Sequence, residues 1–491
     1  MGEETERKIR MRRFLEKYKT ELLLFIASLL YLGSLSFFEY ATLSLGWHDF
    51  GLQIQILSSP RFSEGRLWSY DWGADFLSVH FSPLLYVLSI FLIPLPFLEW
   101  WLIIGCIALS VGIAGLFAFF RRVTGNSSAS SFFAIAFLLN PYVTATHLYM
   151  HYEVFLVPLL SGFLLFAWED RKMPAFACLL GILLLKEDGW IYALSGTFLL
   201  LGKKPFRTTL VYFLISVLYS VIALGLFKQT LFPHSSALFL EHWGKTPVAF
   251  LLNSLANPLE ILRILSTGSG KFLALSLLAI PVLATWRSIP GIAVSFLWLS
   301  SISPDRASLA FFYGLAPTLL LFLTIPFAFG VWEAITNRIG DSRKFEFLLP
   351  ISLLITSIAA STFPNPALLR SPNLPDLAAS LKTVPEKVPI LISLIKLRGY
   401  KANTTFSSFN TAAYVFQGGE LRLPYKDWEA VRAKQWKPDL VVLTTEQKEP
   451  LLREVTPSEM IRFFDTNLEY TSILQTRNLR AWRKKSSYLA I

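Results

Sequence analysis

The segment HLYMHYEVF, His147 to Phe155, places two histidines and a glutamate between two long apolar runs. A charged group near a bilayer costs on the order of 2.5–3.5 kcal/mol by insertion scales unless it faces water or a partner, so this cluster indicates a site. His151 and Glu153 are two residues apart and can flank one ligand. Either can move a proton or bind a divalent cation such as Mg²⁺ or Mn²⁺. His147 is an additional candidate, with packing as its alternative role.

Two further segments carry side chains of the same kinds. Asp49, in WHD, directly follows the first apolar run, and His48 precedes it. A carboxylate at the bilayer edge can accept a proton or hold a cation, whereas the structural alternative is a helix cap or a pair with Arg61 or Arg66. His80, in VHFSP, begins another apolar run and is a third site candidate.

A lysine and two acids form the KEDG tip between two short apolar arms. Lys186 could bind a phosphate as a point charge, or it could be neutralised by Glu187 and Asp188, and the sequence leaves both readings open. Arg306, in SPDR, ends another apolar run and has the same two readings. Its functional ligand would be a lipid phosphate.

The chain that positions these groups has 491 residues, of which 53% are hydrophobic and 16% are charged. This composition excludes a soluble enzyme and a disordered chain, and it indicates a polytopic membrane protein. The net charge of +11 is explained by basic residues between apolar runs rather than by nucleic-acid binding. The basic start ERKIRMRRFLEKYK predicts a cytoplasmic N-terminus.

The apolar runs and the basic residues between them predict an α-helical protein with about eleven transmembrane helices. The predicted spans are 22–45, 100–120, 131–149, 154–168, 174–185, 190–201, 209–227, 272–285, 291–302, 309–330 and 347–363. Within a long first outer loop, 46–99, WHDFGLQIQILSSPRF could form an amphipathic helix at the interface, and FSPLLYVLSIFLIPLPF is interpreted as re-entrant or interfacial.

This topology gathers the titratable groups on one side of the membrane. All six histidines fall on the outer side, namely His48, His80, His147, His151, His234 and His242. The acids set among apolar residues fall there too, namely Asp49, Asp71, Asp75, Glu153, Glu187 and Asp188. Such a distribution is typical of an active site that opens outward. The alternative is that longer outer loops simply collect more polar residues.

The composition changes after residue 363, where a turn-rich linker begins. We therefore predict two domains, a transmembrane domain at 1–363 and a small soluble extracytoplasmic α/β domain at 364–491. In the second, PDLVVLTT is interpreted as a strand or helix core, SEMIRFFDTN as a helix and YTSILQTRNLRAWRK as a hairpin. No catalytic motif is found there, which favours a lid or a platform for a partner.

Several of these motifs occur in one order. An acid after the first helix is followed by HFSPLLYVL, RRVTG, NPYVTATHLYMHYEVF and LLLKEDGW. This order resembles the predicted membrane protein family called domain of unknown function 2079, which in turn resembles the GT-C superfamily of polytopic glycosyltransferases. The resemblance covers roughly Leu22 to Leu201, and SPDRASLAFFYGLAP to a lesser degree.

The resemblance implies a GT-C-like fold in the plasma membrane and sugar transfer at the outer leaflet. The donor would be a sugar on a polyprenyl phosphate, and the acceptor a lipid, a glycan or a protein. Asp49 would be a general base or metal ligand. His151 and Glu153 match the second acidic motif, with a histidine replacing the first acid of the usual pair. The donor phosphate would be bound by Lys186, Arg306 and His80.

Two other classes of function compete with this interpretation. One is a transporter or lipid flippase, but transporters bind near the bilayer midplane between matched halves, whereas these polar groups gather at one face and no second half is apparent. The other is a membrane scaffold without catalysis, whose outer domain binds a partner protein. A scaffold predicts that Asp49 and Glu153 tolerate alanine, and a transferase predicts that they do not.

Overall fold

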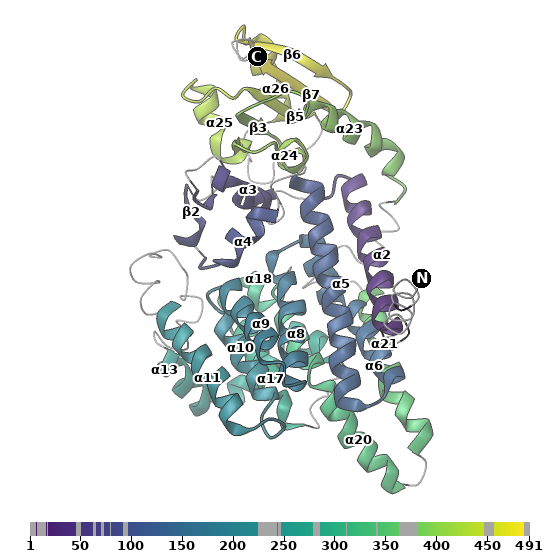
Figure 1. The fold of residues 1–491 in the computed structure, drawn as a ribbon. Coiled ribbons are helices and arrows are strands. Elements are labelled where there is room, and N and C mark those ends of the chain that lie inside the picture. Colours follow the sequence, from purple (N-terminus) through teal and green to yellow (C-terminus); the bar gives the residue numbers. More distant parts are fainter. Residues whose placement is uncertain are drawn as a thin grey trace.

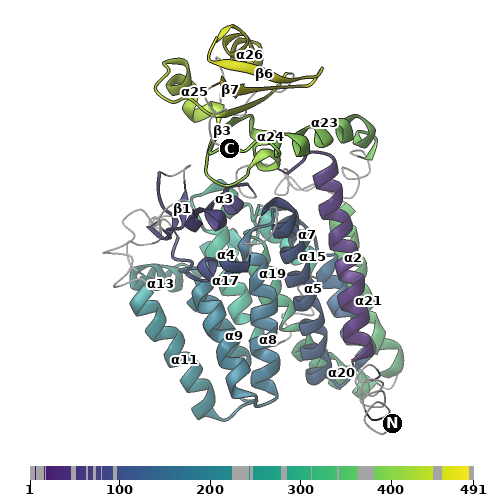
Figure 2. The ribbon, with the colours of Figure 1, turned by 45° about the horizontal axis from the view of Figure 1, so that its top comes forward.

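The computed structural model describes residues 18–45, 51–61, 65–69, 73–78, 80–91, 97–223, 247–277, 285–310, 312–339, 342–362, 381–445 and 456–485, together with Glu6, Glu16 and Trp243. Figures 1 and 2 show a bundle of helices with a small sheet of the C-terminal region stacked on one end. We call that end the sheet end and the opposite end the basal end.

Helices of different lengths, most of them apolar, build the bundle. They are α2 (Lys19–Ala41), α5 (Phe97–Thr124), α6 (Ser127–Leu138), α7 (Pro141–Tyr149), α8 (Leu156–Trp168), α9 (Lys172–Leu185), α10 (Gly189–Leu199), α11 (Phe206–Ser220), α13 (Pro247–Ala256), α14 (Pro258–Leu265), α15 (Gly268–Ser276), α17 (Ile289–Leu299), α18 (Pro304–Ala307), α19 (Leu315–Phe322), α20 (Ile325–Ile339) and α21 (Ser342–Thr362). In the described residues four helices are long and apolar enough to cross a membrane, or five if one bent pair counts as a span. The protein is therefore a membrane protein, and the predicted number of eleven spans stays a prediction.

The bent pair is α6 and α7, whose axes differ by 51°. Pro141 is the first residue of α7 and has no N–H to donate back into α6, while the Asn140 side chain accepts the Tyr142 N–H at 3.0 Å. A new helix therefore starts here with a changed direction. This turn directs α7 toward the short helix η4 (Tyr152–Phe155) that carries Glu153.

Ion pairs tie helices together at the basal end. They are Arg121–Glu21, Arg122–Glu169 and Lys204–Asp170, at 2.5, 2.7 and 2.8 Å, and we call them the basal ion pairs. Nearby, Arg287 donates to the carbonyl oxygens of Leu199 and Leu201, which α10 leaves unpaired at its C-terminus. Basic side chains thus fix the basal helix ends to one another.

The first outer loop folds between the bundle and the sheet (Figures 1 and 2). Its elements are α3 (Leu52–Ser58), η2 (Ser59–Arg61), β1 (Trp68–Ser69), β2 (Ala74–Asp75), η3 (Phe76–Ser78) and α4 (Leu84–Phe91). The helix expected in WHDFGLQIQILSSPRF is present as α3, but six of its seven residues are buried. It therefore lies inside the protein rather than with one face at the membrane interface.

The C-terminal region forms a mixed five-stranded sheet in the order β4-β3-β5-β7-β6. Its elements are α23 (Val384–Leu397), β3 (Thr404–Ser407), α24 (Phe409–Val415), β4 (Glu420–Arg422), α25 (Pro424–Arg432), β5 (Leu440–Thr444), α26 (Pro457–Thr466), β6 (Tyr470–Gln475) and β7 (Leu479–Lys484). β3 is parallel to β4 and β5, and the predicted hairpin is β6–β7. The proposed domain boundary at 363 lies outside the described residues.

The C-terminal region is fastened to the bundle by a partly buried polar contact. Glu99, in the first turn of α5, accepts the Tyr40 hydroxyl and the Arg398 guanidinium, each at 2.7 Å. The same guanidinium donates to the backbone oxygen of Tyr414. The Tyr414 hydroxyl lies 3.4 Å from the backbone nitrogen of Leu45, which donates to it. Side chains of α2, α5 and the C-terminal region therefore meet at one point.

Candidate active site

The turn that carries His151 and Glu153 is held by three separate segments. Helix α7 ends at Met150, whose φ of 47° is left-handed. The Trp101 indole N–H donates to the Met150 carbonyl oxygen at 3.0 Å. The Tyr152 N–H donates to Oε1 of Gln53 on α3, also at 3.0 Å. The first outer loop and α5 thus set the direction of the two residues that the sequence placed in the site.

His151 is fixed in one orientation and one protonation state. Its ring stacks on Phe312 with centroids 3.6 Å apart and planes 7° from parallel. The Glu153 N–H donates to His151 Nδ1 at 3.4 Å, so the neutral ring carries its proton on Nε2. Burial, reinforced by Lys186, holds the pKa of His151 well below its ordinary value. His151 is therefore a neutral imidazole whose available group is an N–H donor.

A tight turn between α9 and α10 presents Lys186. The Gly189 N–H donates to the Lys186 carbonyl oxygen at 2.9 Å. A Cβ on Gly189 would clash with the Ile182 carbonyl oxygen, so only glycine fits this position without displacing backbone. The glycine of KEDG is thus required for the close packing of the two arms.

Lys186 forms a buried ion pair with Glu153, with Nζ 2.7 Å from Oε1. The two side chains are only 6% and 5% exposed, respectively. Asp188 Oδ2 lies 3.9 Å from the same Nζ. Burial opposes the charged ammonium, but Glu153 and Asp188 outweigh it and hold the pKa of Lys186 well above its ordinary value. Lys186 is therefore neutralised chiefly by η4, rather than by its own neighbours in KEDG.

Glu187 instead contacts the first outer loop. Its Oε1 lies 2.8 Å from Nδ1 of His80, and its Oε2 accepts the Phe81 N–H at 3.1 Å. Burial alone would raise the pKa of Glu187, but His80 and Lys186 outweigh burial and lower it to about 2. This carboxylate is ionised and fully engaged, so its role is to fasten the tip to the loop.

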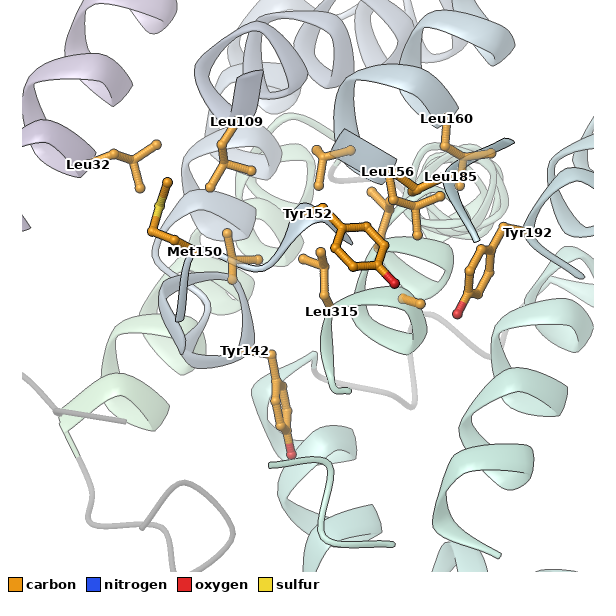
Figure 3. Packing of buried hydrophobic residues seen from close by; sticks show 14 of the residues in the cluster. Leu32, Leu109, Tyr142, Met150, Tyr152, Leu156, Leu160, Leu185, Tyr192 and Leu315 are labelled. Carbon is orange, nitrogen blue, oxygen red and sulfur yellow. The ribbon is translucent and has the colours of Figure 1, made fainter. Parts of the chain in front are cut away.

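Asp188 has one engaged and one unengaged oxygen. Oδ2 accepts the Tyr192 hydroxyl at 3.1 Å, whereas the buried Oδ1 has no hydrogen-bond partner within the described part of the chain. Burial raises the pKa of Asp188, and Lys186 opposes that rise only in part. Figure 3 shows the hydroxyl groups of Tyr152 and Tyr192 on the same side of buried leucines. Asp188 is therefore suited to accept a hydrogen bond and a proton.

Arg306 adds a second cation to this group. Its guanidinium lies over the rings of Trp298 and Tyr313, 5.5 and 5.3 Å from their centroids. It is close enough to act electrostatically on both Glu153 and Asp188. The structure therefore brings together six of the residues singled out in the sequence, which we call the outer polar cluster: His80, Glu153, Lys186, Glu187, Asp188 and Arg306.

Other candidates lie elsewhere. His147 is fully buried, and its Nε2 lies 2.9 Å from Ser36 Oγ and 3.0 Å from the Leu32 carbonyl oxygen, both on α2. It thus joins α7 to α2 rather than to the cluster. Asp75 Oδ1 accepts the Leu77 N–H at 2.9 Å within its own loop. Five candidates fall outside the described residues, namely His48, Asp49, Asp71, His234 and His242.

Three positioning residues were missed in the sequence, namely Gln53, Tyr192 and Phe312. Gln53 is one of two glutamines in the apolar stretch LQIQILS, and a buried amide there was the available signal. Tyr192 follows KEDG at the spacing of one helical turn, which would bring it to Asp188. For Phe312, no pattern distinguishes it from the many other phenylalanines.

The described donor atoms around Lys186 do not fit a divalent cation, and Asp49 lies outside the described residues. Glu153 Oε1 is bound to Lys186, and His151 Nδ1 accepts a backbone N–H. In the portion of the chain that is described, no three His, Cys, Asp or Glu side chains are grouped as metal ligands. Structural zinc and magnesium sites need several such groups to converge on one point.

Comparison with solved structures finds matches at low sequence identity. Arabinofuranosyltransferase AftD from Mycobacteria has 13% sequence identity and a TM-score of 0.47 over 94% of this chain, which spans 40% of AftD. ArnT from Cupriavidus metallidurans bound to undecaprenyl phosphate has 14% identity and a TM-score of 0.48, over 94% of this chain and 97% of ArnT. ArnT from Cupriavidus metallidurans in the apo state has 15% sequence identity and a TM-score of 0.47. The match covers 95% of this chain and 98% of ArnT.

Comparison with curated proteins finds no match. The sequence profile of one family, described as predicted membrane protein (DUF2079), matches residues 39–389. The matched range contains the whole outer polar cluster and the helices that carry it. The chain belongs to the DUF2079 family of predicted membrane proteins.

Proposed function

We propose that the protein is a membrane glycosyltransferase that moves a sugar from a polyprenyl phosphate to an acceptor hydroxyl at the outer leaflet. One observation carries the proposal. Glu153, Lys186 and Asp188 are buried together, and Arg306 acts on both acids from another helix. Burying several charged side chains is costly, and such clusters are typical of functional sites.

The proposed reaction is a displacement at the anomeric carbon of the donor sugar. The acceptor oxygen forms the new glycosidic bond while the bond from the sugar to the phosphate oxygen breaks. A carboxylate takes the acceptor proton, and the lipid phosphate leaves with the bonding electrons. Positive charge near the departing phosphate stabilises the transition state.

The candidates for the base differ in how their oxygens are used. Glu187 is bound on both oxygens and has a pKa lowered to about 2, whereas Asp188 has an unengaged Oδ1 and a raised pKa. When the environments of two carboxyl groups shift their pKa values in opposite directions, one group can act as a base while the other stays a fixed charge. We therefore favour Asp188 over Glu187 as proton acceptor. Asp49 stays the candidate implied by the family resemblance.

The proposed phosphate ligand is Arg306 rather than Lys186. The Lys186 ammonium is already bound to Glu153 at 2.7 Å. Arg306 is partly exposed beside the cluster and presents a planar group with several donors, which suits a phosphate. The His151 Nε2–H is a further donor for the sugar or the phosphate.

The same arrangement supports the proposed orientation. Gln53, on α3 at the sheet end, holds the turn that bears Glu153, whereas the basal ion pairs lie at the opposite end (Figure 2). By the positive-inside rule the basal end faces the cytoplasm. We propose that the N-terminus is cytoplasmic and that the C-terminal sheet and the cluster are extracytoplasmic.

Transfer in reconstituted vesicles tests the proposed function. The donors are radiolabelled hexoses and pentoses on undecaprenyl phosphate, and the readout is a new labelled product. We expect Asp188→Asn and Arg306→Gln to lower the rate by about 100-fold or more, because the first loses the proposed base and the second loses the proposed phosphate ligand. The basal variant Arg122→Gln is the matched control and should keep the rate.

Transfer retained by both Asp188→Asn and Arg306→Gln would contradict this assignment. Release of labelled sugar inside the vesicles without a new bond would instead favour a transporter. A binding partner for the sheet, with no turnover of any donor, would favour a scaffold.

A further inference from the structure

The Lys186 ammonium lies between two carboxylates from different segments. Nζ is 2.7 Å from Oε1 of Glu153 on η4 and 3.9 Å from Oδ2 of Asp188 at the start of α10. The side chains of Lys186, Glu153 and Asp188 are 6%, 5% and 14% exposed, respectively, so little water reaches them. Two buried acids are thus balanced by one cation that belongs to the chain.

A divalent cation between two carboxylates would likewise balance their negative charge. Mg²⁺ and Mn²⁺ take carboxylate oxygens at about 2.0–2.2 Å and complete their shell with further oxygens or nitrogens. An ammonium group has three donors and needs only hydrogen-bond distances. Lys186 therefore satisfies both acids where a metal would need additional ligands.

The surroundings of the ammonium also disfavour a metal. The neighbouring imidazole of His151 is stacked on Phe312, and its Nδ1 already accepts the Glu153 N–H. The Phe312 ring lies below the ammonium, with Nζ 5.8 Å from its centroid. Arg306 adds positive charge that acts on the same two acids. A second cation at this point would be repelled by two fixed positive charges.

We propose that Lys186 takes the place of a divalent cation between Glu153 and Asp188, so that this site works without a metal. The inference deepens the proposed function, because transfer would then be insensitive to chelators. It replaces the divalent cation that the family resemblance implied. Its own test measures metal binding, so its failure and the failure of the transferase proposal are distinguishable.

Mn²⁺ binding to the purified, chelator-stripped protein in detergent tests the proposal, with the loss of the free-ion EPR signal as readout. In a protein that retains Lys186, we expect Glu153→Gln to leave Mn²⁺ binding unchanged. Lys186→Ala should gain one Mn²⁺ site per chain, and Lys186→Ala with Asp188→Asn should lose it again. Lys186→Arg is the matched control, because it keeps a cation and should gain no site.

Two results would overturn the proposal. One is a Mn²⁺ site in the wild-type protein that Glu153→Gln removes. The other is a folded Lys186→Ala protein that binds no additional Mn²⁺. If Lys186→Ala does not fold, the wild-type melting temperature decides. An unchanged value in EDTA and in Mn²⁺ supports the proposal, and a fall in EDTA that Mn²⁺ reverses contradicts it.

Discussion

The outer polar cluster and the basal ion pairs use the same residue types at opposite ends of one bundle. Each basal cation has a single acidic partner, and several of these side chains reach solvent, with Arg122 52% and Asp170 71% exposed. In the cluster Lys186 serves two acids and is 6% exposed. The cluster also contains a buried acid oxygen, Asp188 Oδ1, that lacks a partner in the described residues. The basal pairs fasten helices, whereas the cluster keeps charged groups buried together, as the proposed transferase site would require.

Removing one acid from each region should give the largest difference in unfolding free energy between the cluster and the basal pairs. Glu153→Ala leaves the Lys186 ammonium buried without its nearest partner, which we expect to cost about 3–5 kcal/mol of unfolding free energy. Glu169→Ala removes a pair with an exposed Arg122 and should cost about 1 kcal/mol or less. Unfolding in mixed detergent and SDS micelles measures both. Equal losses would show that the two regions do not differ in kind.

The two glutamines of α3 allow a buried polar group with a partner to be compared with one that lacks a partner in the described residues. Both are buried, but Gln53 accepts the Tyr152 N–H, whereas the Gln55 amide has no hydrogen-bond partner among the described residues. Gln53→Leu should cost about 1–3 kcal/mol, because it leaves the Tyr152 N–H unpaired. Gln55→Leu should be neutral or stabilising.

Thermal unfolding and transfer measured on the same preparations check this pair. Gln53→Leu should also lower the transfer rate, since it releases the turn that bears Glu153. A larger loss of stability in Gln55→Leu than in Gln53→Leu would refute the assigned roles.

His147 and His151 lie four residues apart but should differ in role. We expect His147 to contribute to stability and His151 to transfer. His147→Leu removes hydrogen bonds to α2 and should cost about 1 kcal/mol of stability while transfer continues. His151→Leu keeps an apolar group against Phe312 but loses the Nε2–H donor, so transfer should fall by about 10-fold or more. Vesicle transfer and melting temperature distinguish them. Loss of transfer in His147→Leu alone would reverse the assignment.

The pair of Glu187 with His80 should appear as a change in the pH dependence of stability. Its pKa is lowered, so this carboxylate contributes stability that is complete above the unfolded value near 4.5 and lost as the pH falls toward about 2. Melting temperatures from pH 7 to pH 3 should therefore decline less in Glu187→Gln than in the wild type. A parallel decline in both proteins would show that Glu187 is not the titrating group.

The sequence located most of the cluster, because charged residues among apolar ones are visible without a structure. Glu153, Lys186 and Arg306 were found in this way. Their distant partners could not be predicted, since the acid nearest to Lys186 is 33 residues away, and Glu187 binds a histidine 107 residues away. Such pairs depend on how distant segments pack, and local spacing contains no record of that packing.

The helical character of the chain followed from apolar run length, and the hairpin β6–β7 followed from alternation and a turn. The number of membrane passes stays a prediction. α3 shows where the same reasoning fails. Its mixture of leucine, isoleucine and glutamine fits an interfacial helix, yet it is buried between the bundle and the sheet. It packs against α4, β1 and η2 of its own loop and against α5, and local periodicity does not predict such packing.

The contact between Glu99 and Arg398 spans 299 residues of sequence. A ribosome that adds about 5–20 residues per second needs roughly 15–60 s to make the intervening chain. During that time Glu99 and the end of α2 emerge without the guanidinium that later binds them. Formation of this contact is therefore a late step of biosynthesis, and a chain truncated before Arg398 would present Glu99 to the quality-control machinery of the cell without this cation.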